Sequence, residues 1–142
     1  MDGARPAAGG KGPPVRPSLL RPPGQFRPAA ESRLQKLETE GKAIRPAFPD
    51  HVEHNAHTYW LLAPDLQRRD RVIADLRRQG IKAQFHYVPL HSAPAGLRYG
   101  RAGGDLSYTS DVSACLVRMP LWAGLEPEHA RETAEIVIDA LR

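Results

Sequence analysis

The sequence predicts a small α+β domain, an α/β two-layer unit, that follows a tail without regular structure. Residues 31–142 alternate between stretches of helical and of strand periodicity. These stretches are few and short, which favours one small, largely antiparallel or mixed sheet with helices packed on it. Residues 1–30 differ sharply, since they hold half of the chain's 14 prolines together with glycines and scattered arginines.

The first thirty residues have too few apolar side chains to offset the entropy lost on ordering. We therefore expect residues 1–30 to form a disordered or polyproline-like tail. An alternative interpretation is a basic arm that contacts the phosphates of nucleic acid or of a membrane.

The globular part is predicted to begin with a short helix over residues 31–41. Leu34 and Leu37 share one face of this helix, and Gly41 is placed to end it. The stretch NAHTYWLLA, residues 55–63, is rich in aromatic and aliphatic side chains and predicts a strand.

A second helix is predicted over residues 66–79, with Asp65 as its N-cap and Gly80 at its end. Its arginines are expected to face mostly solvent. Residues 81–90 predict a second strand of alternating pattern, which Pro89 ends.

The C-terminal third is predicted to contain a loop, two helices and a short strand. Residues 92–107 are rich in glycine and predict a long functional loop. Thr109 is a candidate N-cap for a helix that carries Val112, Leu116 and Met119, and residues 118–122 predict the short strand. The last helix is expected to start at Glu126-Pro127-Glu128. Its expected buried residues are Ala130, Ala134, Val137, Ile138 and Leu141.

Composition narrows the class of protein. The chain has 142 residues, enough for one domain, and a net charge of +4 that suits a phosphate-bearing partner without requiring one. The single cysteine cannot form an internal disulfide, which favours a cytoplasmic location. No apolar run reaches the roughly 18 residues of a membrane span, so no membrane partner is expected.

Three motifs carry a resemblance to a known family: HNAHTYWLL, GIKAQFHYVPLHSAPAG and SYTSDVSACLVRMPLWAGL. Together they resemble the C-terminal part of the pyridoxal-phosphate-dependent DegT/DnrJ/EryC1/StrS sugar aminotransferases. The resemblance implies the small domain of a fold-type I aminotransferase over residues 31–142, with residues 31–41 as a remnant of the interdomain helix. For the intact enzyme it implies pyridoxal 5'-phosphate as cofactor, a homodimer, and amino transfer from an amino-acid donor, with glutamate expected, to a dTDP-4-keto-6-deoxy sugar.

The same resemblance implies that the catalytic lysine belongs to a large domain that this sequence does not contain. We therefore expect no catalytic residue here, no cofactor held by this chain alone, and a chain that is a fragment or one half of a split protein. The lysines present are Lys11, Lys36, Lys42 and Lys82, and none adjoins a phosphate-binding glycine motif.

With the resemblance, the segment FHYVPLH supplies the candidate substrate-binding residues, His86, Tyr87 and His91. Imidazole and phenol groups at the end of a strand suit sugar hydroxyls and phosphates. Packing of these side chains in the core is the alternative, and a metal site is not expected because the histidine spacing does not converge. The resemblance makes Arg118 a candidate for binding a substrate carboxylate, as small-domain arginines of fold-type I aminotransferases can do, with a surface ion pair as the alternative. Cys115 is expected to be a buried, inert thiol.

Two other functions are compatible with the sequence. The chain could be a non-catalytic module that binds a nucleotide-sugar or a partner subunit. A nucleic-acid binder that uses the basic tail is less favoured, because the arginine-rich helix lacks interleaved aromatic residues.

Overall fold

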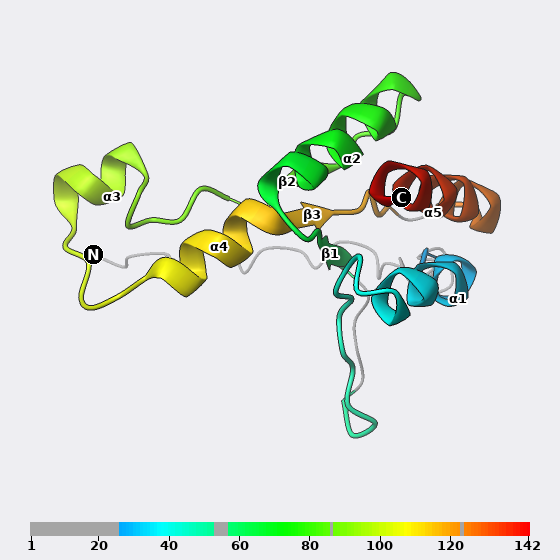
Figure 1. Ribbon diagram of the computed structural model, residues 1–142, viewed down its shortest axis with the longest axis horizontal. Helices are drawn as coiled ribbons and strands as arrows, with labels where there is room; N and C mark the ends of the chain where they lie inside the picture. Colours follow the sequence, from blue (N-terminus) through cyan, green and yellow to red (C-terminus); the bar gives the residue numbers. More distant parts are fainter. Residues whose placement is uncertain (1–25, 53–56, 86, 123) are drawn as a thin grey trace, which may run out of the picture.

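The computed structural model describes residues 26–52, 57–85, 87–122 and 124–142 (Figure 1). Within these residues the chain forms a mixed α+β domain with a three-stranded antiparallel sheet, as the sequence predicted. The elements in chain order are α1 (Phe26–Thr39), β1 (Trp60–Leu62), α2 (Leu66–Arg78), β2 (Gln84–Phe85), α3 (Pro94–Tyr99), α4 (Ser107–Cys115), β3 (Leu116–Arg118) and α5 (Pro127–Leu141).

The sheet has the strand order β1-β3-β2, so the last strand in sequence lies in the middle. Both neighbours run antiparallel to it, and Arg118 is the partner of Trp60 on one side and of Gln84 on the other. Val117 likewise pairs with Leu61 and Phe85. A central strand that follows a helix directly fixes the position of that helix, here α4, relative to the sheet.

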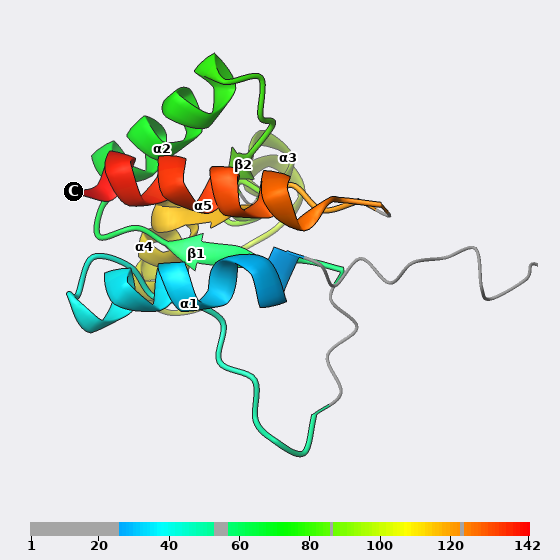
Figure 2. The same cartoon turned by 90° about the vertical axis from the view of Figure 1, so that its right-hand side faces the viewer.

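Helices α1, α2 and α5 surround the core, and α5 packs against both of the others (Figure 2). Alternate residues of the sheet face this core, as strand geometry requires. The buried residues of the sheet and its flanks are Tyr59, Leu61, Ala63, Ala83, Val117 and Met119. The intervening residues on β2 and β3 are exposed or half-buried, so one face of the sheet is left more open than the other.

Small residues allow α5 to approach its neighbours closely. Ala130, Ala134 and Ala140 are almost fully buried, as are Val137 and Leu141. The expected start of α5 is confirmed, because Pro127 occupies the first turn and Glu128 lies near the positive end of the helix dipole.

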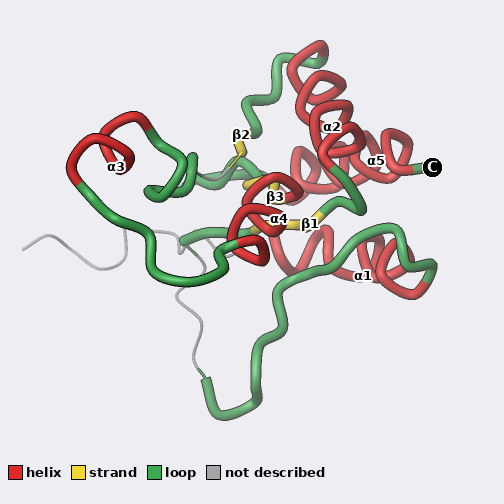
Figure 3. Tube along the Cα trace, turned by 60° about the vertical axis from the view of Figure 1, so that its left-hand side comes forward, coloured by secondary structure: helices red, strands yellow, loops and turns green. Residues whose placement is uncertain are grey.

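Residues 87–115 form an arm that projects from the body of the domain (Figure 3). Neither α3 nor α4 contains a buried residue, and α4 reaches the body through contacts with α2 and β2. The long loop expected over residues 92–107 is interrupted by α3, and residues 100–106 have no helix or strand. Among the described helices, none combines the length and the apolar character that a bilayer crossing requires.

The first helix begins earlier than predicted, at Phe26 rather than Glu31. Phe26 and Ala30 are buried, and the Phe26 ring lies 5.0 Å from that of Tyr59 between centroids. Pro28 is compatible with this start because proline is tolerated in the first turn of a helix. The expected boundary of the tail at residue 30 is therefore wrong, since residues 26–30 belong to the packed domain.

The strands are shorter than predicted. Residues 55, 56 and 86 of the two expected strands lie outside the described residues, and within the described parts of 55–63 and 81–90 the strands are Trp60–Leu62 and Gln84–Phe85. Phe85 is half exposed rather than a core residue. Backbone hydrogen bonds continue the β1–β3 pairing by one residue at each end, from Met119 N to Tyr59 O at 2.8 Å and from Ala63 N to Cys115 O at 2.9 Å.

The region around Thr109 also differs from prediction. Thr109 is not an N-cap, because α4 starts at Ser107, whose amide and hydroxyl donate to the Asp105 carboxylate at 2.9 Å each. The helix ends at Cys115, so Leu116 belongs to β3 and the expected strand over 118–122 lies two residues too late. In contrast, the predicted cap of α2 is confirmed, since Asp65 accepts a hydrogen bond from the backbone amide of Arg68.

Candidate functional site

The predicted substrate-binding segment runs along the surface of α4. Ser113 Oγ donates to the backbone carbonyl of Tyr87 at 3.2 Å, and Ser110 Oγ lies 3.0 Å from Nε2 of His91. Ser110 and Ser113 are three residues apart and so share one face of the helix. Ser110 and Ser113, on one face of α4, therefore fix the positions of Tyr87 and His91 along the arm.

The side chains of this segment differ in accessibility. Tyr87 is 75% exposed, whereas His91 is half-buried against α4. His86 lies outside the described residues. The core-packing alternative does not apply to Tyr87, and the arrangement presents a phenol at the surface with an imidazole four residues further along the chain.

Arg69 joins the arm to the body of the domain. Its Nε donates to the carbonyl of Ala114 at 2.9 Å, in the last turn of α4, and its guanidinium lies 5.1 Å from the centre of the Phe85 ring. The carbonyls of a last helical turn lack partners within the helix, so this hydrogen bond satisfies one of them. Arg69 thereby connects α2, β2 and α4.

Sequence reasoning placed this arginine on a solvated helix face, although its side chain is only 12% exposed. The sequence does contain a signal of this burial, because Arg69 precedes Val72, Ile73 and Leu76 by three, four and seven residues. That spacing puts Arg69 on the apolar stripe of α2 rather than opposite it.

Cys115 ends α4 close to this contact. Burial raises the pKa of the Cys115 thiol, and the carboxylates of Asp65 and Asp111 raise it further. A raised pKa disfavours the reactive thiolate. The half-buried thiol is thus suited to packing rather than to nucleophilic chemistry.

Arg118 lies in the sheet and not on the arm, so it does not join Tyr87 and His91 in one site. Its side chain is half-buried and forms no ion pair with another described residue, which removes the surface ion-pair alternative within the described part of the chain. Arg118 instead borders a cavity of about 230 Å³. The other residues that line it are Lys82, Gln84, Met119, Pro120, Leu121 and Trp122.

A larger groove of about 1030 Å³ adjoins this cavity along α5. Lys82 and Trp122 border both hollows, and Ile81, His129 and Ile136 contribute to the groove. In the part of the chain that the structure describes, no group of three or more histidine, cysteine, aspartate or glutamate side chains is placed to hold a metal ion.

A family model and several known proteins match most of this chain. The sequence profile of the DegT/DnrJ/EryC1/StrS aminotransferase family matches residues 27–140. The "Pleiotropic regulatory protein" of Geobacillus stearothermophilus is 26% identical over 115 residues, which is 80% of this chain and 30% of that protein.

Solved structures share the fold. The aminotransferase PseC of Helicobacter pylori, involved in the biosynthesis of pseudoaminic acid, matches with a TM-score of 0.67 and 19% identity, over 84% of this chain and 32% of that one. NtdA of Bacillus subtilis with bound cofactor PMP matches with a TM-score of 0.66 and 18% identity, over 87% of this chain and 29% of that one.

The chain thus spans about a third of the length of these relatives, and it does so with nearly all of its described residues. The matched range contains every helix and strand of the described domain apart from the two end residues. The chain belongs to the DegT/DnrJ/EryC1/StrS aminotransferase family.

Proposed function

We propose that this chain is the small-domain portion of a sugar-nucleotide aminotransferase, of the kind represented by dTDP-4-amino-4,6-dideoxygalactose transaminase. In the assembled enzyme an amino group passes from an amino acid, glutamate in this proposal, to a dTDP-4-keto-6-deoxy sugar. The active unit is a homodimer in which each small domain serves a large domain supplied by other sequence.

The placement of Tyr87 and His91 on the arm, outside the core, is the observation that supports this proposal. A 75% exposed tyrosine and a half-buried histidine held by Ser110 offer a phenol and an imidazole to a ligand outside this domain. Groups of this kind suit sugar hydroxyls and nucleotide phosphates. We assign substrate orientation to both residues, and to His86, which lies outside the described part.

The described lysines do not fit the cofactor that the family uses. Pyridoxal 5'-phosphate needs a lysine amine for its imine and a cradle of donors for its phosphate. Lys36 is on the exposed face of α1, Lys42 pairs with Glu40 at 2.8 Å, and Lys82 is exposed beside the sheet. This chain alone is therefore not expected to hold the cofactor, and the lysine and the phosphate cradle are assigned to the large domain.

The proposal is tested by reconstitution. The full 142-residue chain is mixed with the large-domain polypeptide of a family sugar aminotransferase and with pyridoxal 5'-phosphate, and amino transfer to a dTDP-4-keto-6-deoxy sugar is assayed. We expect transfer with both parts present and none with either alone. Tyr87→Phe and His91→Ala should each reduce transfer by about tenfold, the effect of losing one hydrogen bond of about 1.4 kcal/mol.

The non-catalytic alternative gives a different pattern in the same experiment. A module that only binds would interact with a nucleotide-sugar or with the large-domain polypeptide, as read by calorimetry, without restoring transfer. If neither transfer nor binding is detected, the proposed function is rejected.

A further inference from the structure

Ser110 makes two contacts with its single hydroxyl group. The Ser110 Oγ donates to the carbonyl oxygen of Leu106 at 3.2 Å, and it lies 3.0 Å from Nε2 of His91. A hydroxyl has one proton to donate and two lone pairs that accept. Because this proton is given to Leu106, the imidazole has to be the donor in the second contact. Both contacts are therefore satisfied only when Nε2 of His91 carries a hydrogen atom.

The groups in this chain of hydrogen bonds are held in place by the backbone around them. The Leu106 carbonyl also accepts from the backbone amide of Ser110 at 3.0 Å, at the start of α4. His91 lies in a turn in which the amide and the hydroxyl of Ser92 donate to the Pro89 carbonyl at 3.0 and 3.1 Å. Successive hydrogen bonds of one direction polarise and strengthen each other. This favours the direction that runs from His91 through Ser110 to Leu106.

The second ring nitrogen of His91 is left as an acceptor. A neutral imidazole carries one hydrogen atom, so Nδ1 has a free lone pair when Nε2 is protonated. Nδ1 of His91 has no partner among the described residues. Sugar hydroxyls can donate to such a nitrogen, whereas the oxygens of a nucleotide diphosphate carry no proton near neutral pH and cannot.

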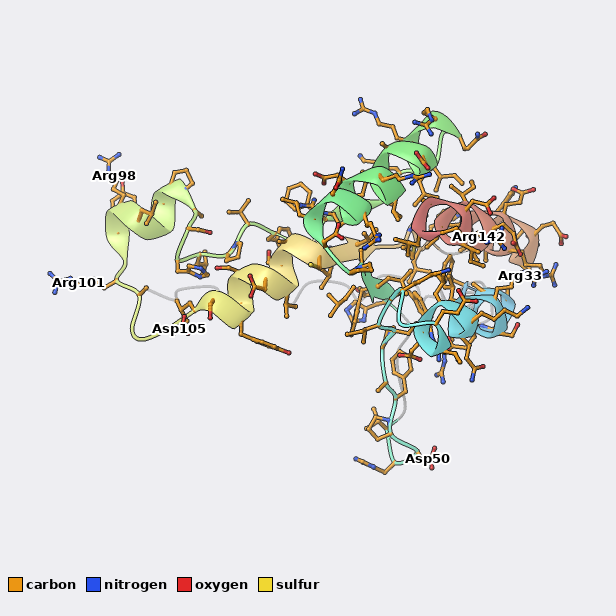
Figure 4. All side chains as sticks on the ribbon, viewed as in Figure 1. Arg33, Asp50, Arg98, Arg101, Asp105 and Arg142 are labelled. Carbon is orange, nitrogen blue, oxygen red and sulfur yellow. The ribbon has the colours of Figure 1, made fainter. Side chains whose placement is uncertain are left out.

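The charged side chains of the arm agree with this choice. Arg98 and Arg101 lie at the outer end of the arm, and Asp105 lies beside the start of α4 (Figure 4). The Asp105 carboxylate accepts from the amide and the hydroxyl of Ser107. Within the described residues, no charged group contacts His91. Phosphates are bound most strongly by cationic donors, and none of the described ones is placed beside this imidazole.

We propose that Ser110 is a positioning residue that holds His91 as the Nε2–H tautomer, so that Nδ1 accepts a hydrogen bond from a hydroxyl of the sugar. Ser110 acts through the imidazole and not by touching the substrate. A ring that is fixed in one tautomer before binding avoids the loss of affinity that the other tautomer would cause. The inference rests on the proposed function, and it narrows the ligand of His91 there to the sugar part of the nucleotide-sugar.

The tautomer is measured by NMR on the full chain, without cofactor or large domain, in a mildly alkaline buffer in which imidazoles are mostly neutral. The chemical shifts of both imidazole nitrogens and the Nε2–H proton signal report it, and His91→Ala assigns these signals. We expect a protonated Nε2, an unprotonated Nδ1 and an Nε2–H proton that exchanges slowly enough to be observed. Ser110→Ala should remove this proton signal, whereas Ser110→Thr should keep it because threonine retains the hydroxyl.

Ser113→Ala is the matched control. Ser113 lies on the same face of α4 but donates to the backbone carbonyl of Tyr87, so this substitution should leave the His91 signals unchanged. A protonated Nδ1 in the wild type, or an unchanged proton signal in Ser110→Ala, would overturn the inference. Equal loss of the signal in Ser110→Ala and Ser113→Ala would do so too, since both serines would then only hold the arm together.

The reconstituted enzyme tests the consequence for the substrate. Ser110→Ala should raise KM for the dTDP-4-keto-6-deoxy sugar about fivefold and leave kcat nearly unchanged, the pattern of a lost contact in substrate binding. dTDP alone, used as an inhibitor, should bind Ser110→Ala and His91→Ala as tightly as the wild type. Weaker binding of dTDP to either variant would place His91 at the phosphates and overturn the assignment of a sugar hydroxyl. If no transfer is reconstituted, the proposed function fails, whereas the spectra of the chain alone still decide the role of Ser110.

Discussion

At the scale of single residues, Arg45 ties the first helix to the segment that leads into the sheet. Its guanidinium is only 12% exposed and forms hydrogen bonds with the carboxylates of Glu31 and Glu38, both on α1. The Tyr59 hydroxyl donates to Glu31 at 3.3 Å, and burial raises the pKa of Tyr59. Hydrogen bonds from Arg45 lower the pKa of Glu38.

Arg45→Met should lower the free energy of unfolding by about 1–3 kcal/mol, because it leaves two carboxylates without their partly buried partner. The matched control is Arg131→Met, which removes an exposed pair with Glu128 and should change stability by less than about 1 kcal/mol. Urea titrations of the two variants at neutral pH make the comparison. Equal losses would contradict a special role for Arg45.

The same contact predicts a pH dependence. The folded pKa of Glu38 is lowered, so its stabilising contribution is fully present above its unfolded value of 4.5 and is lost as pH falls through the folded pKa. The wild-type chain should therefore lose stability more steeply than Arg45→Met as pH decreases below about 4.5. Urea midpoints measured across that range test this, and parallel curves would argue against it.

Gly96 is a second position where a single added carbon atom, a Cβ, would disturb the local structure. A Cβ there would lie 1.5 Å from the carbonyl oxygen of Leu90, a backbone atom that cannot move aside alone. Gly96→Ala should therefore displace α3 and speed hydrogen exchange of the Leu97 and Gly100 amides, which bond within this turn. Global stability should change little, because α3 buries no residue.

Gly103→Ala is the control for this substitution, since a Cβ at Gly103 meets nothing within 4 Å. Hydrogen exchange at the amides of α3 should then match the wild type. Equal disturbance by both substitutions would mean that glycine content, and not the contact with Leu90, determines the order of α3.

At the scale of elements, the start of α1 can be tested by truncation. Phe26 and Ala30 are buried in the described core, and a chain that lacks only residues 1–25 keeps both of these side chains. Deletion of residues 1–30 also removes Phe26 and Ala30 and should reduce stability by about 3–5 kcal/mol, as for loss of a buried phenylalanine. Thermal melts of both truncated forms test this prediction, and Phe26→Ala in the full chain should give an intermediate loss of stability.

The elements that sequence predicted well are those with local signals. Helices α2 and α5 have an amphipathic spacing together with an Asp65 cap or a first-turn proline, and both begin where expected. The elements that it missed depend on distant partners. Phe26 extends α1 because it packs on Tyr59, and β2 pairs with β3, a strand that comes much later in the chain.

The candidate site likewise has parts that local sequence predicts and parts that depend on distant residues. FHYVPLH predicts a substrate-binding segment that carries Tyr87 and His91, but the serines that contact it lie 19 and 26 residues further along the chain, and only the fold brings them close. Arg118 was singled out from sequence, whereas its cavity required the register that places Gln84 opposite it. Cross-strand neighbours of this kind cannot be derived from one strand alone.

At the scale of the whole molecule, the domain consists of a compact body and a projecting arm with many uncovered apolar side chains. The exposed large apolar residues of the arm are Tyr87, Val88, Leu90, Leu97, Tyr99 and Tyr108. Exposed apolar patches on soluble domains commonly mark interaction surfaces. The arm is also the part that is most weakly held, since its helices bury no residue, and local opening is easiest in such regions.

The proposed assembly predicts that the arm becomes protected when the large domain binds. For the chain alone, we expect fast hydrogen exchange and early protease cleavage in the arm, while α5 exchanges slowly because it lies in the core. Addition of the large-domain polypeptide should slow both processes in the arm by about tenfold, which corresponds to about 1.4 kcal/mol of added local stability, and should leave α5 unchanged.

Replacement of Leu90, Leu97 and Tyr99 by serine should abolish that protection without altering the unfolding midpoint, because these side chains are 69–80% exposed. Protection that persists in the triple variant, or that falls on the body instead, would show that the arm is not the docking surface.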